Sequence, residues 1–185
     1  MPTQSEIKIK TLVCNTLVEM LETTSLYKIK VIDLVEQAGI SRSSFYVYFD
    51  SIYEVIQLIE DNFIAGLPVE EDFSLNVFLF PKDKYATCRY LKENIKTFRV
   101  LSGPNGDPAF QARLDNRSKR FSSKLSEFIL STPGTAYNKA LPEFISGGTW
   151  QLYKWWAYHE DDMSVEDMGQ LLDQISKYVV RLYQR

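Results

Sequence analysis

Apolar residues recur along most of the chain at spacings of three and four residues, which is the pattern of helices that bury one face. Helices are predicted over residues 5–21, 31–38, 41–48, 51–66, 82–101, 107–130, 137–158 and 164–182. Residues 69–81 fit this spacing poorly and are interpreted as a linker with apolar anchors. The pattern therefore predicts an all-α protein with about eight to nine helices in total.

Residues at the predicted helix ends indicate how the helices are joined. Gly39 can adopt the left-handed conformation that ends a helix, and the Ser41 hydroxyl can cap the helix that follows. Two short helices separated by such a turn form a helix-turn-helix. Further along the chain, Asp107 followed by Pro108 is expected to start one helix, and Ser164 is expected to cap another.

The composition is that of an ordinary globular protein, with 45% hydrophobic and 24% charged residues in 185 positions. No run reaches the roughly 18 apolar residues of a membrane span. The N-terminal residues also lack the apolar core of a secretory signal. We therefore expect a cytoplasmic protein with no membrane partner.

The chain offers little material for catalysis or metal binding. Its two cysteines, Cys14 and Cys88, are far apart and are interpreted as small buried hydrophobic residues, and its single histidine, His159, stands in an acidic stretch. No phosphate-binding loop or nucleophile motif occurs, and residues 103–106 are interpreted as a turn connecting two helices. We expect no catalytic residue, no metal site and no cofactor.

Residues 28–49, KIKVIDLVEQAGISRSSFYVYF, closely resemble the DNA-binding signature of the TetR (tetracycline-repressor-like) family of bacterial transcriptional regulators. The resemblance implies a non-enzymatic protein with a helix-turn-helix DNA-binding domain over residues 1–51. It also implies a larger helical domain over residues 52–185 for ligand binding and dimerisation. Such a homodimer is expected to bind a palindromic double-stranded DNA operator, with repression as the family default.

The predicted helix over residues 41–48 suits a recognition helix, whose first residues reach base edges in the major groove. The Arg42 guanidinium can bond guanine in two places, and Val47 can contact a thymine methyl group. Tyr46 and Tyr48 look like the phosphate-contacting aromatic residues of the family. The candidate DNA-binding residues are Lys28, Lys30, Ser41, Arg42, Ser43, Ser44, Tyr46, Val47 and Tyr48.

Structural roles compete with DNA binding at several of these positions. Lys28 and Lys30 can bind the DNA backbone at the start of the second helix, or they can form a solvated face. Phe45 and Phe49 are expected to be core residues, and Asp33 is expected to be structural.

The charge of the N-terminal domain departs from the family pattern. Many members carry a lysine at the start of the fourth helix, where this chain has Ile52, and Asp50 replaces another commonly basic residue. Residues 1–52 contain five basic and six acidic side chains, so we expect modest non-specific DNA affinity. The alternative function is a protein-interaction module whose helix-turn-helix is a scaffold that binds DNA weakly or only with a partner.

The C-terminal half resembles the branch of the family that contains dihydroxyacetone-kinase-activator-like regulators, through residues 90–94, 98, 101, 110, 144–148 and 155–156. This resemblance implies that the last two helices pair with their mates in a four-helix bundle. The expected interface residues are Gly147, Gly148, Trp155, Leu171, Leu172, Ile175 and Val179. Alternatively, the two glycines mark a kink and the aromatic stripe is intramolecular core. The apolar circumference of residues 137–158 predicts burial on more than one side.

The family resemblance also implies a cavity for a small-molecule effector, whose identity is unknown, and a protein co-regulator is a further possible partner. The candidate lining residues are Tyr90, Phe98, Phe110, Arg113, Phe121 and Tyr153, for which core packing is the alternative. A basic stripe on the sixth predicted helix comprises Arg113, Arg117, Arg120 and Lys124. We interpret this stripe as solvated, with an anionic ligand, a partner protein or the DNA backbone as the other interpretations.

Overall fold

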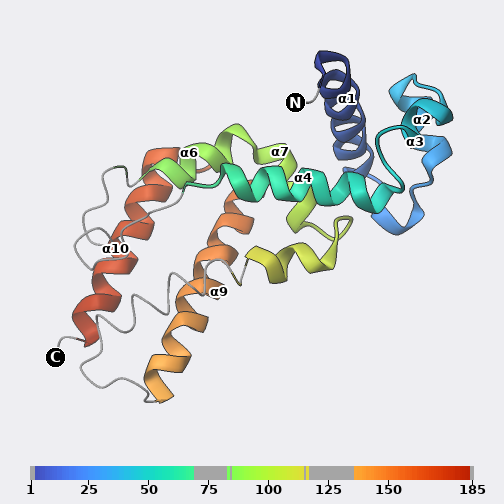
Figure 1. Cartoon of the computed structure of the whole chain (residues 1–185). Helices are drawn as coiled ribbons and strands as arrows, with labels where there is room; N and C mark the ends of the chain where they lie inside the picture. The colour runs from blue at the N-terminus through green and yellow to red at the C-terminus, as the bar shows by residue number, and fades with distance from the viewer. Residues whose placement is uncertain (1–2, 69–82, 84, 115, 117–135, 184–185) are drawn as a thin grey trace. The chain divides into compact units, whose positions relative to one another are not determined.

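The computed structural model describes residues 3–68, 83, 85–114, 116 and 136–183. Within these residues every regular element is a helix and none is a strand, so the all-α prediction is confirmed (Figure 1). The chain forms two compact units. The first contains Met1–Gly66 and Lys96–Phe110, and the second contains Leu67–Ile95 and Gln111–Arg185. The division into functional domains at residue 51 stays a prediction.

The hydrophobic pattern predicted the α-helices at the start of the first unit, but not the short 3-10 helix between the first two of them. They are α1 (Gln4–Leu21), the short 3-10 helix η1 (Leu26–Lys28), α2 (Val31–Ala38), α3 (Arg42–Tyr46) and α4 (Ile52–Gly66). Helix α1 packs against both α2 and α4, and α2 packs against α3. This packing holds the helix-turn-helix formed by α2 and α3 on the long first helix.

The core of this unit is built from apolar side chains at helical spacing. Buried members include Val13, Leu17, Leu21, Leu34, Val35, Phe45, Phe49, Val55, Ile56 and Ile59. The expected core roles of Phe45 and Phe49 are confirmed, and their ring centroids lie 5.6 Å apart. Burying one such side chain contributes about 1.5 to 3 kcal/mol, so these two rings anchor α3 firmly.

Local turn chemistry fixes both ends of the turn between α2 and α3, as the sequence predicted. Gly39 ends α2 with φ 66° and ψ 32°, a left-handed conformation that other residues rarely adopt. The Ser41 Oγ accepts a hydrogen bond from the Ser44 amide at 3.0 Å and so caps α3. Asp33 is structural as expected, because its Oδ2 accepts from the Lys30 amide at 3.2 Å.

The recognition helix is shorter than the predicted 41–48. Regular α-helix ends at Tyr46, although Val47 keeps helical angles of φ −70° and ψ −27°. The amides of Tyr48 and Phe49 both donate to the Phe45 carbonyl. The last turn is therefore tighter than an α-helical turn, with an i to i+3 hydrogen bond beside the i to i+4 one. Phe45 and Phe49, at the two ends of this turn, are both buried.

The predicted helix over residues 82–101 is wrong in its continuity. The structure has α6 (Ala86–Glu93) and α7 (Ile95–Ser102), separated at Asn94, whose φ of −113° and ψ of 25° are not helical. The backbone amide and the side-chain Nδ2 of Asn94 both donate to the Tyr90 carbonyl, at 3.0 and 2.9 Å. An asparagine that bonds the preceding turn in this way competes with the regular helix.

Two later helix starts are confirmed. Residues 108–114 are helical, and the Asp107 Oδ1 accepts from the Ala109 amide at 2.9 Å. The Ser164 Oγ accepts from the Asp167 amide at 3.0 Å at the start of α10 (Val165–Tyr183). The predictions for residues 69–81 and 117–130 lie outside the described residues. No helix of the described chain is long and apolar enough to cross a bilayer.

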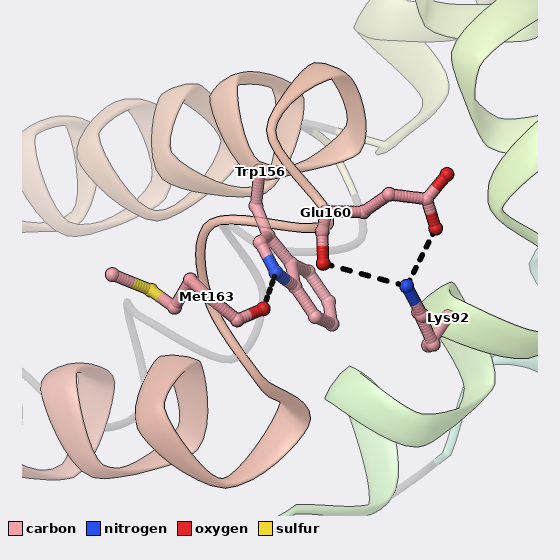
Figure 2. A network of polar contacts seen from close by, with 4 residues as sticks. All are labelled: Lys92, Trp156, Glu160 and Met163. Atoms are coloured by element: carbon pink, nitrogen blue, oxygen red, sulfur yellow. Dashed lines mark hydrogen bonds and ion pairs between the residues drawn. The ribbon is translucent and has the colours of Figure 1, made fainter.

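In the second unit, α6 packs against α10, and the turn between α9 (Ala136–Tyr158) and α10 is bonded to α9 and to α6. Trp156 has no exposed surface and its Nε1 donates to the Met163 carbonyl (Figure 2). The Lys92 Nζ of α6 lies 2.6 Å from the Glu160 Oε2 and 3.5 Å from the Glu160 carbonyl oxygen (Figure 2). The turn is therefore held at both of its ends.

The prediction that residues 137–158 are buried on more than one side stays a prediction, because the described residues of the single chain bury only part of α9. Trp150, Tyr153 and Trp156 are buried, but Phe144 is 68% exposed and Trp155 is 40% exposed. The hydrophobic pattern indicates that these apolar side chains favour burial, but it does not indicate whether this chain or another one buries them. The described chain covers one face of α9 and leaves apolar side chains on another.

Candidate nucleic-acid interface

Helix α3 presents a small set of side chains to solvent. Arg42, Ser43, Tyr46 and Val47 are exposed, with Val47 at 72% and Tyr46 at 45%, whereas Phe45 is fully buried. Residues four apart share a face of a helix, which places Arg42 above Tyr46. The buried Phe45 thus orients the opposite, polar face outward.

Arg42 and Tyr46 contact each other on this face. The guanidinium carbon of Arg42 lies 5.5 Å from the centroid of the Tyr46 ring, and Nη2 donates to the Tyr46 Oη at 3.3 Å. A cation above an aromatic ring gains about 0.5 to 1 kcal/mol at an exposed site. This contact restricts the rotamers of Arg42 and leaves its other donors for an external acceptor.

The three serines of the signature differ in what they offer. The Ser41 Oγ is occupied by capping and also lies 2.9 Å from the Ser43 Oγ and 2.8 Å from the Ser44 Oγ. Ser43 is exposed, whereas Ser44 is half-buried. Ser43 is therefore the serine whose hydroxyl is best placed to bond a group outside the protein.

The remaining candidate DNA contacts flank α3. Lys28 and Lys30 are exposed at the end of η1 and just before α2, and Tyr48 is half-buried after α3. The Lys30 backbone amide is already bonded to Asp33, so its side chain is the part left for a phosphate. The structure thus supplies two cations and an aromatic residue in addition to the α3 face.

The junction between α3 and α4 is acidic. Asp50 is exposed, and the Glu54 Oε2 accepts from the Asp50 amide at 2.6 Å. Ile52, which stands where many family members have a lysine, is only 7% exposed and belongs to the core. This junction therefore offers no cation to a phosphate, and its two carboxylates oppose one.

The predicted dimer-interface residues of α9 and α10 lie in the second unit. Gly147 and Gly148 are exposed, and a methyl group built on either meets no described atom within 4 Å. Leu171 and Leu172 are half-buried and Ile175 is exposed, while the side chain of Val179 lies outside the described residues. Within the described chain, then, nothing packs closely against the two glycines.

The predicted effector residues are divided between the two units. Phe98 and Phe110 of the first unit have no exposed surface, and their centroids lie 5.7 and 5.8 Å from that of Phe63. Tyr90 and Arg113 of the second unit are half-buried. Phe121 lies outside the described residues, as do Arg117, Arg120 and Lys124 of the basic stripe.

Tyr153 and the two thiols are held in their neutral forms. Burial raises the pKa of Cys88 to about 11, partly offset by its hydrogen bond with Tyr153, and the pKa of Tyr153 is itself raised by burial. Burial also raises the pKa of Cys14 to about 11, although Cys14 is only half-buried, less than the sequence suggested. Neither thiol has the lowered pKa of a nucleophile.

The single histidine is exposed. His159 follows α9, its ring stacks on Trp155 at 4.5 Å, and its Nδ1 lies 2.8 Å from the Trp155 carbonyl oxygen. Among the described residues no group of three or more histidine, cysteine or acidic side chains is placed to hold a metal ion. The contacts of His159 are those of an exposed residue after a helix end.

Two exposed aromatic residues of the first unit were not singled out from the sequence. Tyr27 of η1 is 67% exposed beside Lys28, and Tyr53 near the start of α4 is 52% exposed. The direction of these two side chains depends on how η1 and α4 pack. The one feature of the sequence that could have indicated their exposure is the apolar residue that precedes each of them, Leu26 and Ile52, which is buried.

Comparisons with known proteins agree with this arrangement. Residues 85–178, just over half of the chain, match the TetR_C_8 family, described as a transcriptional regulator C-terminal region. The solved structure of the dihydroxyacetone kinase operon activator DhaS has a TM-score of 0.61 at 14% sequence identity, over 95% of this chain and 98% of that chain. At this identity the likeness shows the fold alone. No curated protein sequence matches the chain. The family match shows that the chain belongs to the TetR family of transcriptional regulators, which are not enzymes.

Proposed function

We propose that this regulator acts as a homodimer that reads a palindromic DNA operator through the exposed face of α3. The observation that carries the proposal is the contact between Arg42 and Tyr46, with the guanidinium held over the ring at 5.5 Å. A preorganised guanidinium loses less entropy when it bonds the two acceptors of guanine. Ser43 and Val47, both exposed beside it, supply a hydroxyl and an apolar contact.

The flanking side chains are proposed to bind the DNA backbone. Lys28 and Lys30 bring positive charge to the start of α2, and Tyr46 and Tyr48 bring hydroxyls to the end of α3. Phosphate contacts of this kind position the protein, whereas base contacts select the sequence. The carboxylates of Asp50 and Glu54 reduce the electrostatic part of the affinity, so specificity depends more than usual on the α3 face.

Dimerisation through α9 and α10 is supported by the surface that the single chain leaves open. Phe144, Trp155 and Tyr178 are all at least 40% exposed, and Gly147 and Gly148 have open space where a side chain would stand. Each glycine inside a helix costs about 1 kcal/mol relative to alanine. The close approach of a partner helix would offset that cost.

A small-molecule effector or a protein co-regulator is proposed to control DNA binding. Tyr90 and Arg113 are half-buried polar side chains, the kind that orients a ligand in a largely apolar site. Tyr153 is buried in the same unit, where it bonds Cys88. By contrast, the close packing of Phe98 and Phe110 on Phe63 favours a core role for those two rings.

The sign of regulation is proposed to be repression, which is the family default, exerted in the cytoplasm where the DNA lies. The name of DhaS gives activation for that protein, so transcription from a template carrying the selected operator is the deciding assay. Lower transcript yield on addition of the protein supports repression. Higher yield assigns activation instead.

The second candidate function is a protein-interaction module, which the carboxylates of Asp50 and Glu54 and the burial of Ile52 favour. A salt titration of duplex DNA binding separates the two functions. A DNA reader binds duplex DNA saturably, and the logarithm of its binding constant falls linearly with the logarithm of the salt concentration. A scaffold gives no saturable binding at any salt concentration, and that result would refute the DNA-reading proposal.

A further inference from the structure

The turn after α7, residues 103–106, contacts the chain between α1 and η1. The Asn105 Nδ2 donates to the carbonyl of Leu21, the last residue of α1, at 3.0 Å. The backbone carbonyl of the same Asn105 accepts from the amide of Leu26, the first residue of η1, at 2.8 Å. One residue thus bonds both ends of the short segment that leads from the first helix to the helix-turn-helix.

These two bonds can fix the position of η1 relative to the end of α1. The last carbonyls of a helix have no partner within the helix, and the Asn105 amide satisfies one of them. Leu26 is only 3% exposed, so its amide is bonded in a place that water reaches poorly. A bonded Leu26 sets where η1 begins, and α2 follows η1 after two residues.

The turn itself is firmly attached to the rest of the first unit. A methyl group on Gly106 would lie 2.6 Å from the Val100 carbonyl oxygen and 2.7 Å from that of Leu101, so only glycine fits there. The Ser102 Oγ donates to the Phe98 carbonyl at 2.6 Å. Phe98 and Phe110, on either side of the turn, both pack on Phe63 of α4.

An ion pair contributes less to this attachment. The Lys96 Nζ of α7 lies 3.3 Å from the Glu22 Oε2, but both side chains are nearly half exposed. Exposed pairs of this kind stabilise proteins weakly. The Asn105 bonds, which are partly buried, are therefore the main polar link between the turn and the α1 end.

We propose that Asn105 is a positioning residue for DNA recognition, which holds η1 and α2 at the angle to α1 that α3 needs. The residue lies outside the DNA-binding signature and 84 positions from Leu21, and it acts through the Leu21 carbonyl and the Leu26 amide. The inference rests on the proposed DNA-reading function, but its structural part is measurable without DNA.

The test uses Asn105→Asp in the full-length protein. The variant keeps the size of the side chain but replaces the donor with an acceptor, which faces the Leu21 carbonyl. Asn105→Ala is the second variant if Asn105→Asp fails to fold. Asn62→Ala is the matched control, because Asn62 is exposed on α4 of the same unit. Hydrogen exchange is measured first on the DNA-free protein.

The inference predicts that amide exchange over residues 22–31 rises about five- to tenfold in the Asn105 variants, with α9 and α10 unchanged. It also predicts about a three- to tenfold loss of affinity for a duplex selected from a random pool, with a smaller loss for random duplex that reflects the backbone contacts of Lys28 and Lys30. A uniformly destabilising substitution would instead raise exchange throughout the unit and lower both affinities by the same factor.

Unchanged exchange over residues 22–31 overturns the inference, as does a loss of affinity that is equal for selected and random duplexes. Failure of the wild-type protein to bind any duplex is a different result. It refutes the proposed function, while the exchange measurement still decides whether Asn105 positions η1.

Discussion

The indole Nε1 of Trp156 donates to the Met163 carbonyl at 2.7 Å and so ties the end of α9 to the start of α10 (Figure 2). Trp156 is fully buried, and the Lys92–Glu160 ion pair lies beside it in the same turn. The hydrogen bond joins the turn to α9, and the ion pair joins it to α6.

Trp156→Phe is expected to lower the free energy of unfolding by about 1 to 3 kcal/mol, because the half-buried Met163 carbonyl loses its hydrogen-bond donor while most of the ring volume remains. Urea denaturation at a fixed protein concentration measures the change. Tyr53→Phe, at an exposed position of α4, serves as the control and should change stability by less than about 0.5 kcal/mol. Equal effects of the two substitutions would rule out a specific role for the Trp156 bond.

Arg42→Ala is expected to cost about 1 to 3 kcal/mol of binding free energy on the selected operator and to relax its preference at one position in each half-site. The reason is the loss of a bidentate contact to a base. Lys8→Ala removes one charge from an exposed position on α1 and is the matched control. Fluorescence anisotropy with selected and random duplexes gives the affinities. An equal loss on both duplexes would assign Arg42 to the DNA backbone.

Asp50→Lys is expected to raise DNA affinity and to steepen the log-log salt dependence by about one unit, because a lysine there can neutralise a phosphate. Ile52→Lys would be a poorer test, since Ile52 is buried and a charge would disturb the core.

Asp61→Lys makes the same charge change about 14 Å along α4 from its first residue. This distance exceeds the Debye length of about 10 Å at 0.1 M salt, so the control should leave the salt slope unchanged. If both substitutions raise affinity equally, only the net charge matters and the α3–α4 junction does not lie against DNA.

Gly148→Ala and Gly169→Ala are expected to act in different ways. An added methyl at Gly148 meets open space in the chain, so it should stabilise the helix by about 1 kcal/mol and weaken dimerisation about tenfold or more. At Gly169 the same methyl would overlap the Tyr85 ring between α10 and α6, so it should cost about 1 to 3 kcal/mol of stability. Sedimentation and denaturation measure the two effects. Unchanged self-association of Gly148→Ala would place the dimer interface elsewhere.

Both thiols are expected to react slowly in the folded protein. Burial raises the pKa of Cys14 and Cys88 to about 11, so at neutral pH the thiolate is scarcer than in the unfolded chain. Iodoacetamide labelling followed by mass spectrometry should be at least about tenfold slower than in guanidinium.

The same pKa shifts predict a pH dependence of stability. Because the folded state keeps these protons more tightly, the contribution of the thiols to stability is complete below pH 9. It is lost as the pH rises from about 9 to about 11. Stability that increases over this interval would contradict the assigned burial of the thiols.

The helix starts and ends that the sequence predicted correctly are set by contacts between residues close together in the sequence. Gly39, Ser41, Asp107 and Ser164 end or start helices through bonds to groups within a few residues, so their roles follow from residue type and spacing. The break at Asn94 was missed because the apolar spacing continues through it, and only the bonds to the Tyr90 carbonyl show the interruption.

The remaining features depend on residues distant in sequence or on other molecules. The Asn105 side chain reaches across 84 positions to the Leu21 carbonyl, and no local pattern indicates this bond. Phe144 and Trp155 belong to the apolar pattern of α9 but are exposed, because hydrophobic spacing does not say which chain covers a face. The DNA-contacting and interface residues accordingly stay predictions, with the structure supplying their exposure and their contacts.

The most direct test of the central claim is selection of bound sequences from a random duplex pool by the purified protein, first at low and then at physiological salt. An operator-reading dimer should enrich one palindrome at both salt concentrations, and Arg42→Ala should lose preference at one position of each half-site. If the dimer is confirmed by sedimentation and yet no sequence is enriched at either salt concentration, the claim that α3 reads DNA is contradicted.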